Sequence, residues 1–285
     1  MINKQRAVIW GAGGTGKRIK EMIDEKYEVI SFLDSDAAKA GMTVAGIPVV
    51  SPDNLFTMQY DKLFYGSLMG LDEMTEYLSN TNVPSEKIDK TYVQISVESR
   101  ILFLKNFSKE CYFYKIPGSV GEAGVYRGAY SYYINKYFPD RKCYLFDTFE
   151  GFSSDDFKFE KEDSLIQAEH LKETSEERVL NIMPNKENII LKKGYFPETA
   201  EGIEDKFCFI NLDMDLYKPT LGGLQFFYPK MVENGVILIH DYFSEAYPNV
   251  RRAVDDYEKI SGEKLCRVPI GDDISLAVIK RGTVR

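Results

Sequence analysis

Short apolar runs alternate along the chain with stretches of helical periodicity, and this pattern predicts an α/β fold. Apolar runs at 6–10 and 27–33 predict strands. The stretch 16–26 between them carries Ile19 and Met22 at helical spacing, with charged residues in the intervening positions. The first part of the chain is therefore expected to contain repeated β–α units.

A second series of the same kind follows an amphipathic stretch at 97–114, in which Ile101, Leu104 and Phe107 share one side of a predicted helix. The change from one series to the next predicts a domain boundary near this stretch. We expect a small Rossmann-like domain at residues 1–95 and a larger one at residues 96–285.

The larger domain also has a pattern of parallel strands alternating with helices. Its runs at 206–217 and 234–243 are apolar at nearly every position, as buried parallel strands are. A helical stretch at 250–262 follows, and two short apolar runs at 264–270 and 274–280 predict an antiparallel hairpin. We therefore predict α/β domains in both halves. In the second, a parallel sheet that ends in an antiparallel C-terminal hairpin is the architecture of a class I S-adenosylmethionine-dependent methyltransferase.

A glycine-rich segment at 8–19 allows two interpretations. Gly11, Gly16 and Lys17 give the spacing of a P-loop, but the next residue is Arg18, where a P-loop needs Ser or Thr to hold Mg²⁺. Gly11, Gly13 and Gly16 also give the G-x-G-x-x-G of a dinucleotide-binding turn. The strand before the turn and the helix after it favour this second interpretation.

An acidic residue at the end of the next strand supports the same interpretation. Asp34 or Asp36 stands where a carboxylate accepts hydrogen bonds from a ribose. We predict that Gly11, Gly13, Gly16 and Asp34 bind a nucleotide or a nucleotide sugar; a turn with a purely structural role remains the alternative.

Composition narrows the class of protein. The 285 residues include 36 basic and 44 acidic side chains, a net charge of −8, which disfavours a nucleic-acid partner. No apolar run approaches the roughly 18 residues of a membrane span, and the N-terminus lacks the core of a signal peptide. A cytoplasmic protein is expected, and a homo-oligomer is possible.

The four cysteines, Cys111, Cys143, Cys208 and Cys266, form no C-x-x-C pair. Three of them lie in apolar runs, which predicts buried free thiols.

The second domain carries a candidate cofactor site at the ends of its first two strands. Glu122 is followed by a glycine-rich turn that contains Gly124, Tyr126 and Gly128, and Asp147 ends the next apolar run. An acidic side chain in that position can hold two ribose hydroxyls, and a glycine turn lets a ligand pass close to the backbone. These five residues are expected to bind an adenosyl group.

Acidic residues also follow the two apolar runs near the end of the chain. Asp213 and Asp215 follow the first run, and His240 and Asp241 follow the second. Three carboxylates at one sheet edge would repel one another, and a bound cation would remove that cost. Oxygen-rich ligands suit Mg²⁺, Mn²⁺ or Ca²⁺. Each residue alone could instead have a structural role. Asp213 could cap the following turn, Asp215 could form an ion pair with Lys218, and His240 could be a hydrogen-bonded histidine near the core.

Residues 115–245 resemble sugar O-methyltransferases of the macrocin and mycinamicin type. The matching segments are GEAGVYRGAYSYYINKYFPDRKCYLFDTFEGF, KKGYFPET and INLDMDLYKPTLGGLQFFYPKMVENGVILIHDY. The resemblance implies S-adenosylmethionine as methyl donor, a divalent metal, usually Mg²⁺, and methylation of a sugar hydroxyl. It also implies a small-molecule or glycan acceptor, whose identity the sequence does not give.

The resemblance further assigns roles at the two strand ends. It makes Asp213, His240 and Asp241 the metal ligands and Asp215 the general base. This chain departs from the family at His240, where aspartate is usual; the loss of one negative charge should weaken Mg²⁺ binding and could favour Mn²⁺. Alternatively, His240 is the catalytic base and not a ligand.

The N-terminal half resembles, more loosely, a nucleotide-binding module of surface-polysaccharide enzymes, through residues 8–19, 29–36 and 46–55. The leading hypothesis is a metal-dependent, S-adenosylmethionine-dependent sugar O-methyltransferase. The alternatives are an inactive nucleotide-sugar-binding or scaffold protein and an NAD-dependent sugar oxidoreductase. Residues 152–188 are expected to form either a lid or a solvated helical face.

Overall fold

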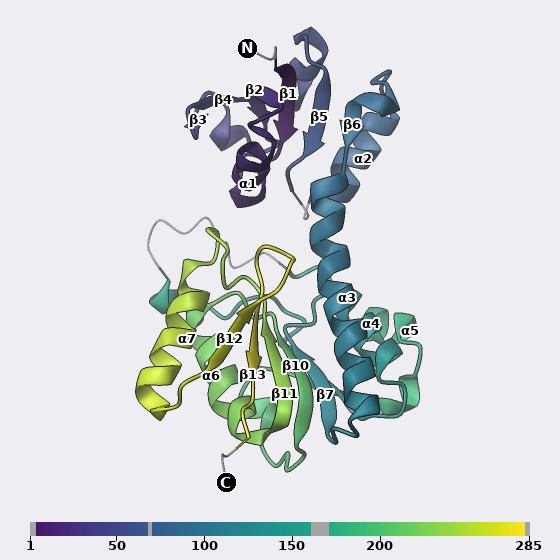
Figure 1. Cartoon of the computed structure of the whole chain (residues 1–285), viewed down its shortest axis with the longest axis vertical. Helices are drawn as coiled ribbons and strands as arrows, with labels where there is room; N and C mark the ends of the chain where they lie inside the picture. The colour runs from purple at the N-terminus through teal and green to yellow at the C-terminus, as the bar shows by residue number, and fades with distance from the viewer. Residues whose placement is uncertain (1–3, 68–69, 161–170, 283–285) are drawn as a thin grey trace. The chain divides into compact units, whose positions relative to one another are not determined.

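The computed structural model describes residues 4–67, 70–160 and 171–282. The chain divides between Val97 and Glu98 into two compact units, the N-terminal unit and the C-terminal unit. This division lies two residues beyond the predicted limit at 95/96. It falls inside helix α3, Thr91–Phe113, which the pattern placed only from residue 97 onward (Figure 1).

The N-terminal unit contains one mainly parallel sheet in the order β3-β4-β2-β1-β5-β6. All its pairings are parallel except that of β3 with β4. Its elements are β1 (Gln5–Trp10), α1 (Gly14–Ile23), β2 (Tyr27–Leu33), β3 (Thr43–Val44), β4 (Ile47–Val50), β5 (Lys62–Tyr65), α2 (Leu71–Ser79) and β6 (Ile88–Asp89). The four last residues of β1 are buried, because a central parallel strand is covered on both faces.

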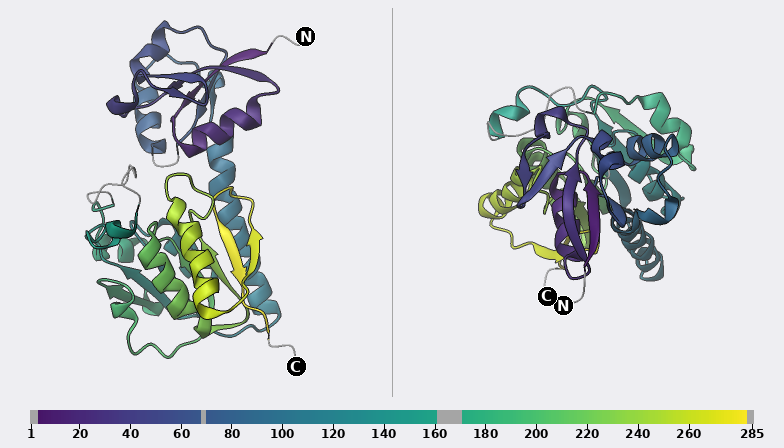
Figure 2. Two further views of the ribbon diagram at one scale, coloured as in Figure 1. Left: turned by 90° about the vertical axis from the view of Figure 1, so that its left-hand side faces the viewer. Right: turned by 90° about the horizontal axis from the view of Figure 1, so that it is seen from above.

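The C-terminal unit contains a second sheet in the order β12-β13-β11-β10-β7-β8-β9. Its strands are β7 (Ser119–Ala123), β8 (Cys143–Asp147), β9 (Ile189–Lys193), β10 (Phe207–Leu212), β11 (Met231–Ile239), β12 (Cys266–Pro269) and β13 (Leu276–Ile279). β7 to β11 pair in parallel, and β13 pairs antiparallel with both β11 and β12. The C-terminal hairpin lies at one edge of this sheet, as the sequence predicts (Figure 2).

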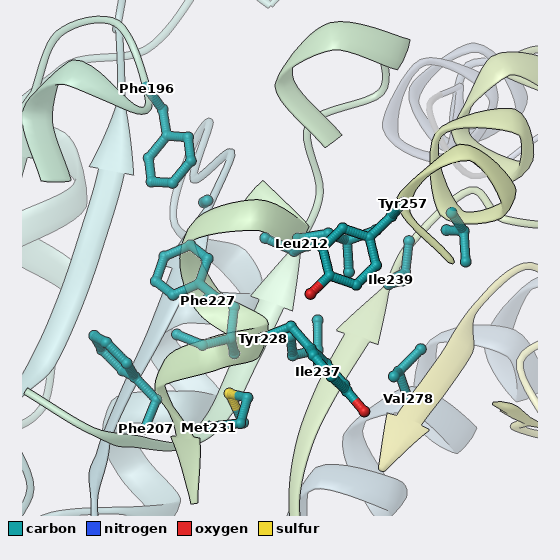
Figure 3. Close-up of a cluster of buried hydrophobic side chains, with 14 of the residues drawn as sticks. Phe196, Phe207, Leu212, Phe227, Tyr228, Met231, Ile237, Ile239, Tyr257 and Val278 are labelled. Atoms are coloured by element: carbon teal, nitrogen blue, oxygen red, sulfur yellow. The ribbon is translucent and has the colours of Figure 1, made fainter. Parts of the chain in front are cut away.

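Helices cover both faces of the second sheet (Figure 1). They are α4 (Ala129–Tyr137), α5 (Glu176–Ile182), α6 (Tyr217–Phe227) and α7 (Pro248–Ser261), together with the C-terminal part of α3. On one face, aromatic residues of β10, α6 and α7 form a core that includes Phe207, Phe227 and Tyr257 (Figure 3). On the other face, Leu104 of α3 packs into a core with Phe209. Burial on both faces explains why β10 is apolar at every position except Asn211.

Other expectations from the sequence have clear outcomes. Cys111, Cys143 and Cys208 are buried free thiols, as predicted, and Cys266 is partly buried. Among the described residues, no helix is long and apolar enough to cross a membrane. The segment 152–188, considered as a lid, lies partly outside the described residues; its described part includes the short helix α5, which begins after the capping hydroxyl of Ser175.

Candidate active site

The parallel strands of the second sheet bring their carboxyl ends to a common edge. Backbone hydrogen bonds continue past the ends of the strands: Asp213 N donates to Ala123 O at 2.8 Å, and His240 N donates to Leu212 O at 2.9 Å. The residues that follow β7, β10 and β11 are therefore held side by side, although they are far apart in the sequence.

Asp213, His240 and Asp241 converge at this edge. His240 Nδ1 lies 2.9 Å from Asp213 Oδ1 and 2.6 Å from Asp241 Oδ2. One ligand atom from each of the three residues lies within 4.8 Å of the others, a spacing that could hold a metal ion. The three residues predicted as metal ligands thus form one cluster, which we call the carboxylate cluster together with Asp215.

Charge couples the members of the cluster. Burial raises the pKa of Asp213, but the positive charges of His240 and Arg100 outweigh it, so this pKa lies well below its usual value. For His240, burial and Arg100 lower the pKa, whereas the nearby carboxylates of Asp213 and Asp241 raise it to a net value of about 10. The cluster therefore contains an imidazolium at neutral pH when it holds no other cation.

Asp215 lies in the same cluster but behaves differently. Its pKa is raised well above the usual value, first by burial and then by the charges of Asp241 and Asp213. Asp215 and Asp241 both have positive φ angles, 60° and 56°, a conformation that few residues other than glycine adopt. The suggested pairing of Asp215 with Lys218 is replaced by a different contact: Lys218 Nζ lies 3.2 Å from the carboxylate of Asp156.

Arg100 of α3 is a site residue that the sequence did not identify. Its Nη2 donates to Asp213 Oδ2 at 2.8 Å and to Asn211 Oδ1 at 2.9 Å. Its guanidinium lies over the ring of Tyr130, 4.1 Å from the ring centroid. The sequence did contain a sign of this role: Arg100 is a charged residue one helical turn before Leu104, on the apolar side of the predicted helix.

The turn between β7 and α4 is fixed by close packing against the cluster. Gly124 has a φ of +88°, and a Cβ there would lie 1.8 Å from the carbonyl oxygen of Asp213. Only glycine allows this approach. Gly128, with a φ of +78°, is the residue before α4. The glycines of the predicted cofactor turn therefore have a structural requirement of their own.

Asp147, at the end of β8, holds the same turn in place. Its Oδ2 accepts hydrogen bonds from the N–H groups of Val125 and Tyr126, at 2.7 and 2.8 Å, and its Oδ1 accepts one from Phe149 N. Asp147 is thus brought to the glycine-rich turn, as the sequence predicts for an acid beside an adenosyl site. Contact of Asp147 or Tyr126 with a ligand stays a prediction.

Glu122 points into the interior of the protein. It is only 2% exposed, and its carboxylate accepts hydrogen bonds from Asn211 Nδ2, at 2.7 Å, and from the hydroxyl of Ser131. Burial, and secondarily the charge of Asp213, raises its pKa to about 8. Glu122 is therefore tied to Arg100 through Asn211, and direct contact with a cofactor stays a prediction.

The N-terminal unit repeats the arrangement of an acid beside a glycine turn. Asp34 Oδ2 accepts hydrogen bonds from Ala12 N at 2.9 Å and Lys39 Nζ at 3.0 Å. A Cβ on Gly11 or Gly16 would lie 2.5 or 1.9 Å from a backbone oxygen, so both glycines are required by packing. By contrast, a Cβ on Gly13 would meet nothing within 4 Å.

Comparisons with known proteins agree with this architecture. The N-terminal part, residues 3–89, matches the family described as C2185-like, N-terminal. Among solved structures, the O-methyltransferase NovP superposes with a TM-score of 0.55 at 22% identity, covering 65% of this chain and 80% of that chain. The calicheamicin methyltransferase CalS11 gives a TM-score of 0.52 at 18% identity, covering 73% and 90%. At these identities the likeness establishes the methyltransferase fold alone.

Curated relatives point in the same direction. The chain is 26% identical over 155 residues to demethyldecarbamoylnovobiocin O-methyltransferase of Streptomyces niveus, and equally to a tetracenomycin rhamnosyl 4'-O-methyltransferase of Streptomyces olivaceus. Each match covers 50% of this chain and 58% of the relative. The family model for macrocin-O-methyltransferase (TylF) matches residues 85–268, and the chain therefore belongs to the macrocin-O-methyltransferase family.

Proposed function

We propose that this protein is an S-adenosylmethionine-dependent O-methyltransferase that methylates a hydroxyl group of a sugar. Family membership supports the O-methyl transfer, and the curated relatives are named for acting on a novobiocin precursor and on a rhamnosyl group. The observation that carries the proposal is the packing of Gly124, in the cofactor turn, directly against the backbone of Asp213 in the carboxylate cluster. A donor at the turn and an acceptor at the cluster would be neighbours.

The donor is proposed to bind along the turn between β7 and α4. Gly124 and Gly128 would let the ligand approach the backbone, and Asp147 would accept from the ribose hydroxyls. A carboxylate oxygen has two lone pairs, so Asp147 Oδ1 can accept a second hydrogen bond besides that from Phe149 N. S-adenosylmethionine supplies an activated methyl group, and the protein's task is to align it with the acceptor.

The cluster is also proposed to hold a divalent cation. Asp213, His240 and Asp241 fit such an ion, because their ligand atoms converge and two of them are carboxylates. A bound cation would supply positive charge that lowers the pKa of a sugar hydroxyl. The imidazole in place of a third carboxylate favours Mn²⁺ over Mg²⁺ as the preferred ion.

Asp215 is proposed as the group that takes the proton from the acceptor hydroxyl. It is 9% exposed, and its pKa is raised well above the usual value by burial and by the charges of Asp241 and Asp213, so its carboxylate holds a proton more strongly than an ordinary aspartate does. His240 is the alternative base when a bound cation, in place of a proton on the imidazole, compensates the two carboxylates: both carboxylates approach Nδ1, so the neutral ring would keep its proton there and accept the new one at Nε2. If Asp215 is the base, replacing Asp215 should abolish proton transfer. If His240 is the base, replacing His240 should abolish it.

Isothermal titration with S-adenosylhomocysteine, with and without Mn²⁺ or Mg²⁺, tests the proposal. Micromolar binding of S-adenosylhomocysteine is expected, and an absence of binding under every condition would refute it. The alternative of an inactive scaffold predicts that Asp213→Ala changes no activity. A purified protein that absorbs in the band of reduced nicotinamide would instead favour the oxidoreductase.

The N-terminal unit is proposed to bind a nucleotide or a nucleotide sugar. The space beside Gly13 supports this proposal, because the second glycine of such a turn is the one that lets a pyrophosphate approach the backbone. Asp34 would accept from the ribose, since its carboxylate already lies against the turn. Titration with UDP, with UDP-glucose and with NAD, each followed by calorimetry, distinguishes these ligands from a unit with only a structural role.

A further inference from the structure

We propose that Arg100 is the built-in counter-ion of the carboxylate cluster: it orients and neutralises Asp213 when no divalent cation is present and limits how tightly such a cation is held. This inference rests on the cation site of the proposed function. It concerns a residue of α3, an element that contributes none of the proposed ligands. Arg100 is therefore a positioning residue and not a catalytic one.

The guanidinium of Arg100 is held from several directions. Nη2 bridges Asp213 Oδ2 and Asn211 Oδ1, and the ring of Tyr130 lies 4.1 Å from the guanidinium carbon. Asn211 is itself fixed, because its amide nitrogen donates to Glu122 at 2.7 Å. The side chain of Arg100 is only 13% exposed. An arginine held this way keeps one orientation, and so does the carboxylate that it contacts.

The two oxygens of Asp213 face different partners. Oδ2 accepts from Arg100, and Oδ1 lies 2.9 Å from His240 Nδ1. Oδ1 is therefore the oxygen that faces the cluster, while Arg100 occupies the other one. Arg100 can thus remain in contact with Asp213 while a cation is bound through Oδ1.

Charge determines the expected effect of removing Arg100. Without it, a largely buried carboxylate loses a permanent positive partner, a change that is strongly destabilising. A divalent cation would then compensate for the missing charge and would also escape the repulsion of the guanidinium. Loss of Arg100 should therefore make stability depend on the cation.

The test compares Arg100→Met, Arg100→Lys and the wild-type full chain. The unfolding midpoint is measured in EDTA and in Mn²⁺, and the affinity for Mn²⁺ is measured by titration. Arg100→Met should lower the midpoint in EDTA by roughly 5–10 °C and regain most of it in Mn²⁺. Its affinity for Mn²⁺ should rise at least about tenfold. Arg100→Lys keeps the charge and should keep the wild-type affinity, although it cannot reproduce the planar contacts.

Arg141→Met is the matched control. Arg141 is another arginine of the C-terminal unit. It donates to the backbone oxygens of Ile116 and Gly118, which precede β7 and so lie at the amino ends of the parallel strands, whereas the cluster lies at their carboxyl ends. Its loss should lower the midpoint equally in EDTA and in Mn²⁺ and leave the affinity for Mn²⁺ unchanged. The control separates a general loss of packing from a loss of charge at the cluster.

Several outcomes would overturn the proposal. If Arg100→Met behaves like Arg141→Met, or has no effect, Arg100 is not a counter-ion. If Mn²⁺ binds wild type but binds Arg100→Met no more tightly, the cation site stands and the role of Arg100 fails. If Mn²⁺ binds neither protein, both the cation site and the counter-ion fail, and S-adenosylhomocysteine binding by the same samples shows whether the donor site remains.

Discussion

His240 Nδ1 lies 2.6 Å from Asp241 Oδ2, so two consecutive residues at the end of β11 form a charged pair inside the carboxylate cluster. Asp213 approaches the same nitrogen at 2.9 Å. A single imidazolium thus neutralises parts of two carboxylates. This is the position at which the resemblance to sugar O-methyltransferases leads us to expect an aspartate.

Replacing this imidazole tests its effect on metal preference. His240→Asp removes one positive charge and adds a negative one, so Mg²⁺ should bind at least about tenfold more tightly. In EDTA the variant should be less stable than wild type, because a fourth carboxyl group then joins Asp213, Asp215 and Asp241. Calorimetric titration with Mg²⁺ checks the affinity; an unchanged affinity would mean that residue 240 does not face the ion.

Asp213→Asn is expected to reduce methyl transfer by a factor of about 100 or more, because the neutral amide is a weaker metal ligand and no longer forms an ion pair with Arg100. Binding of S-adenosylhomocysteine should change little. The matched control is Asp205→Asn: Asp205, which precedes the same strand, accepts from Ser119 and Tyr144. It should keep its activity while losing about 1 kcal/mol of stability. Equal loss of activity in both variants would contradict the assignment.

Gly124→Ala tests the close approach of the cofactor turn to the cluster. The new methyl group would collide with the backbone of Asp213 at a positive φ, so we expect a stability loss of about 3 kcal/mol or more and loss of donor binding. Gly202→Ala is the control, since Gly202 also has a positive φ, +75°, but nothing lies within 4 Å. It should cost about 1 kcal/mol. Urea unfolding of both variants measures the difference.

Stability in EDTA is expected to fall as the pH rises from about 4.5 to about 10. The pKa of His240 is raised to about 10 and that of Glu122 to about 8, so the folded state holds protons that the unfolded state has released. The contribution of His240 is complete below pH 6.5 and is lost as the pH approaches 10; that of Glu122 is lost from about pH 4.5 to pH 8. Unfolding at pH 6, 8 and 10 measures the slope. Glu122→Gln should flatten it below pH 8, and an unchanged slope would argue against a protonated Glu122.

Replacing Gly13 and replacing Gly16 in the N-terminal glycine turn should have different effects on stability. Gly13→Ala should leave stability within about 0.5 kcal/mol, because Gly13 has an ordinary φ of −90° and open space beside it. If a nucleotide binds there, the methyl group should weaken its binding. Gly16→Ala should destabilise the unit by about 3 kcal/mol, because its Cβ would lie 1.9 Å from Gly11 O. Thermal unfolding with and without UDP-glucose separates the two effects.

Much of the candidate site follows from the sequence because parallel strands end at one edge. Acidic residues placed directly after apolar runs must then lie near one another, and the predicted ligands Asp213, His240 and Asp241 do form one cluster. The same logic places Asp147 beside the turn that contains Gly124. The apolar periodicity was also sufficient for the α/β architecture and for the antiparallel hairpin at the end of the chain.

The sequence by itself determined the strands, the glycine turns and the acidic residues at the strand ends, because these depend on local pattern and on the polarity of parallel strands. Only the tertiary structure decided that Arg100 reaches Asp213, 113 residues later, and that Glu122 turns inward to Asn211. Side-chain direction and long-range partners depend on which faces pack together. Periodicity along the chain carries little information about that choice.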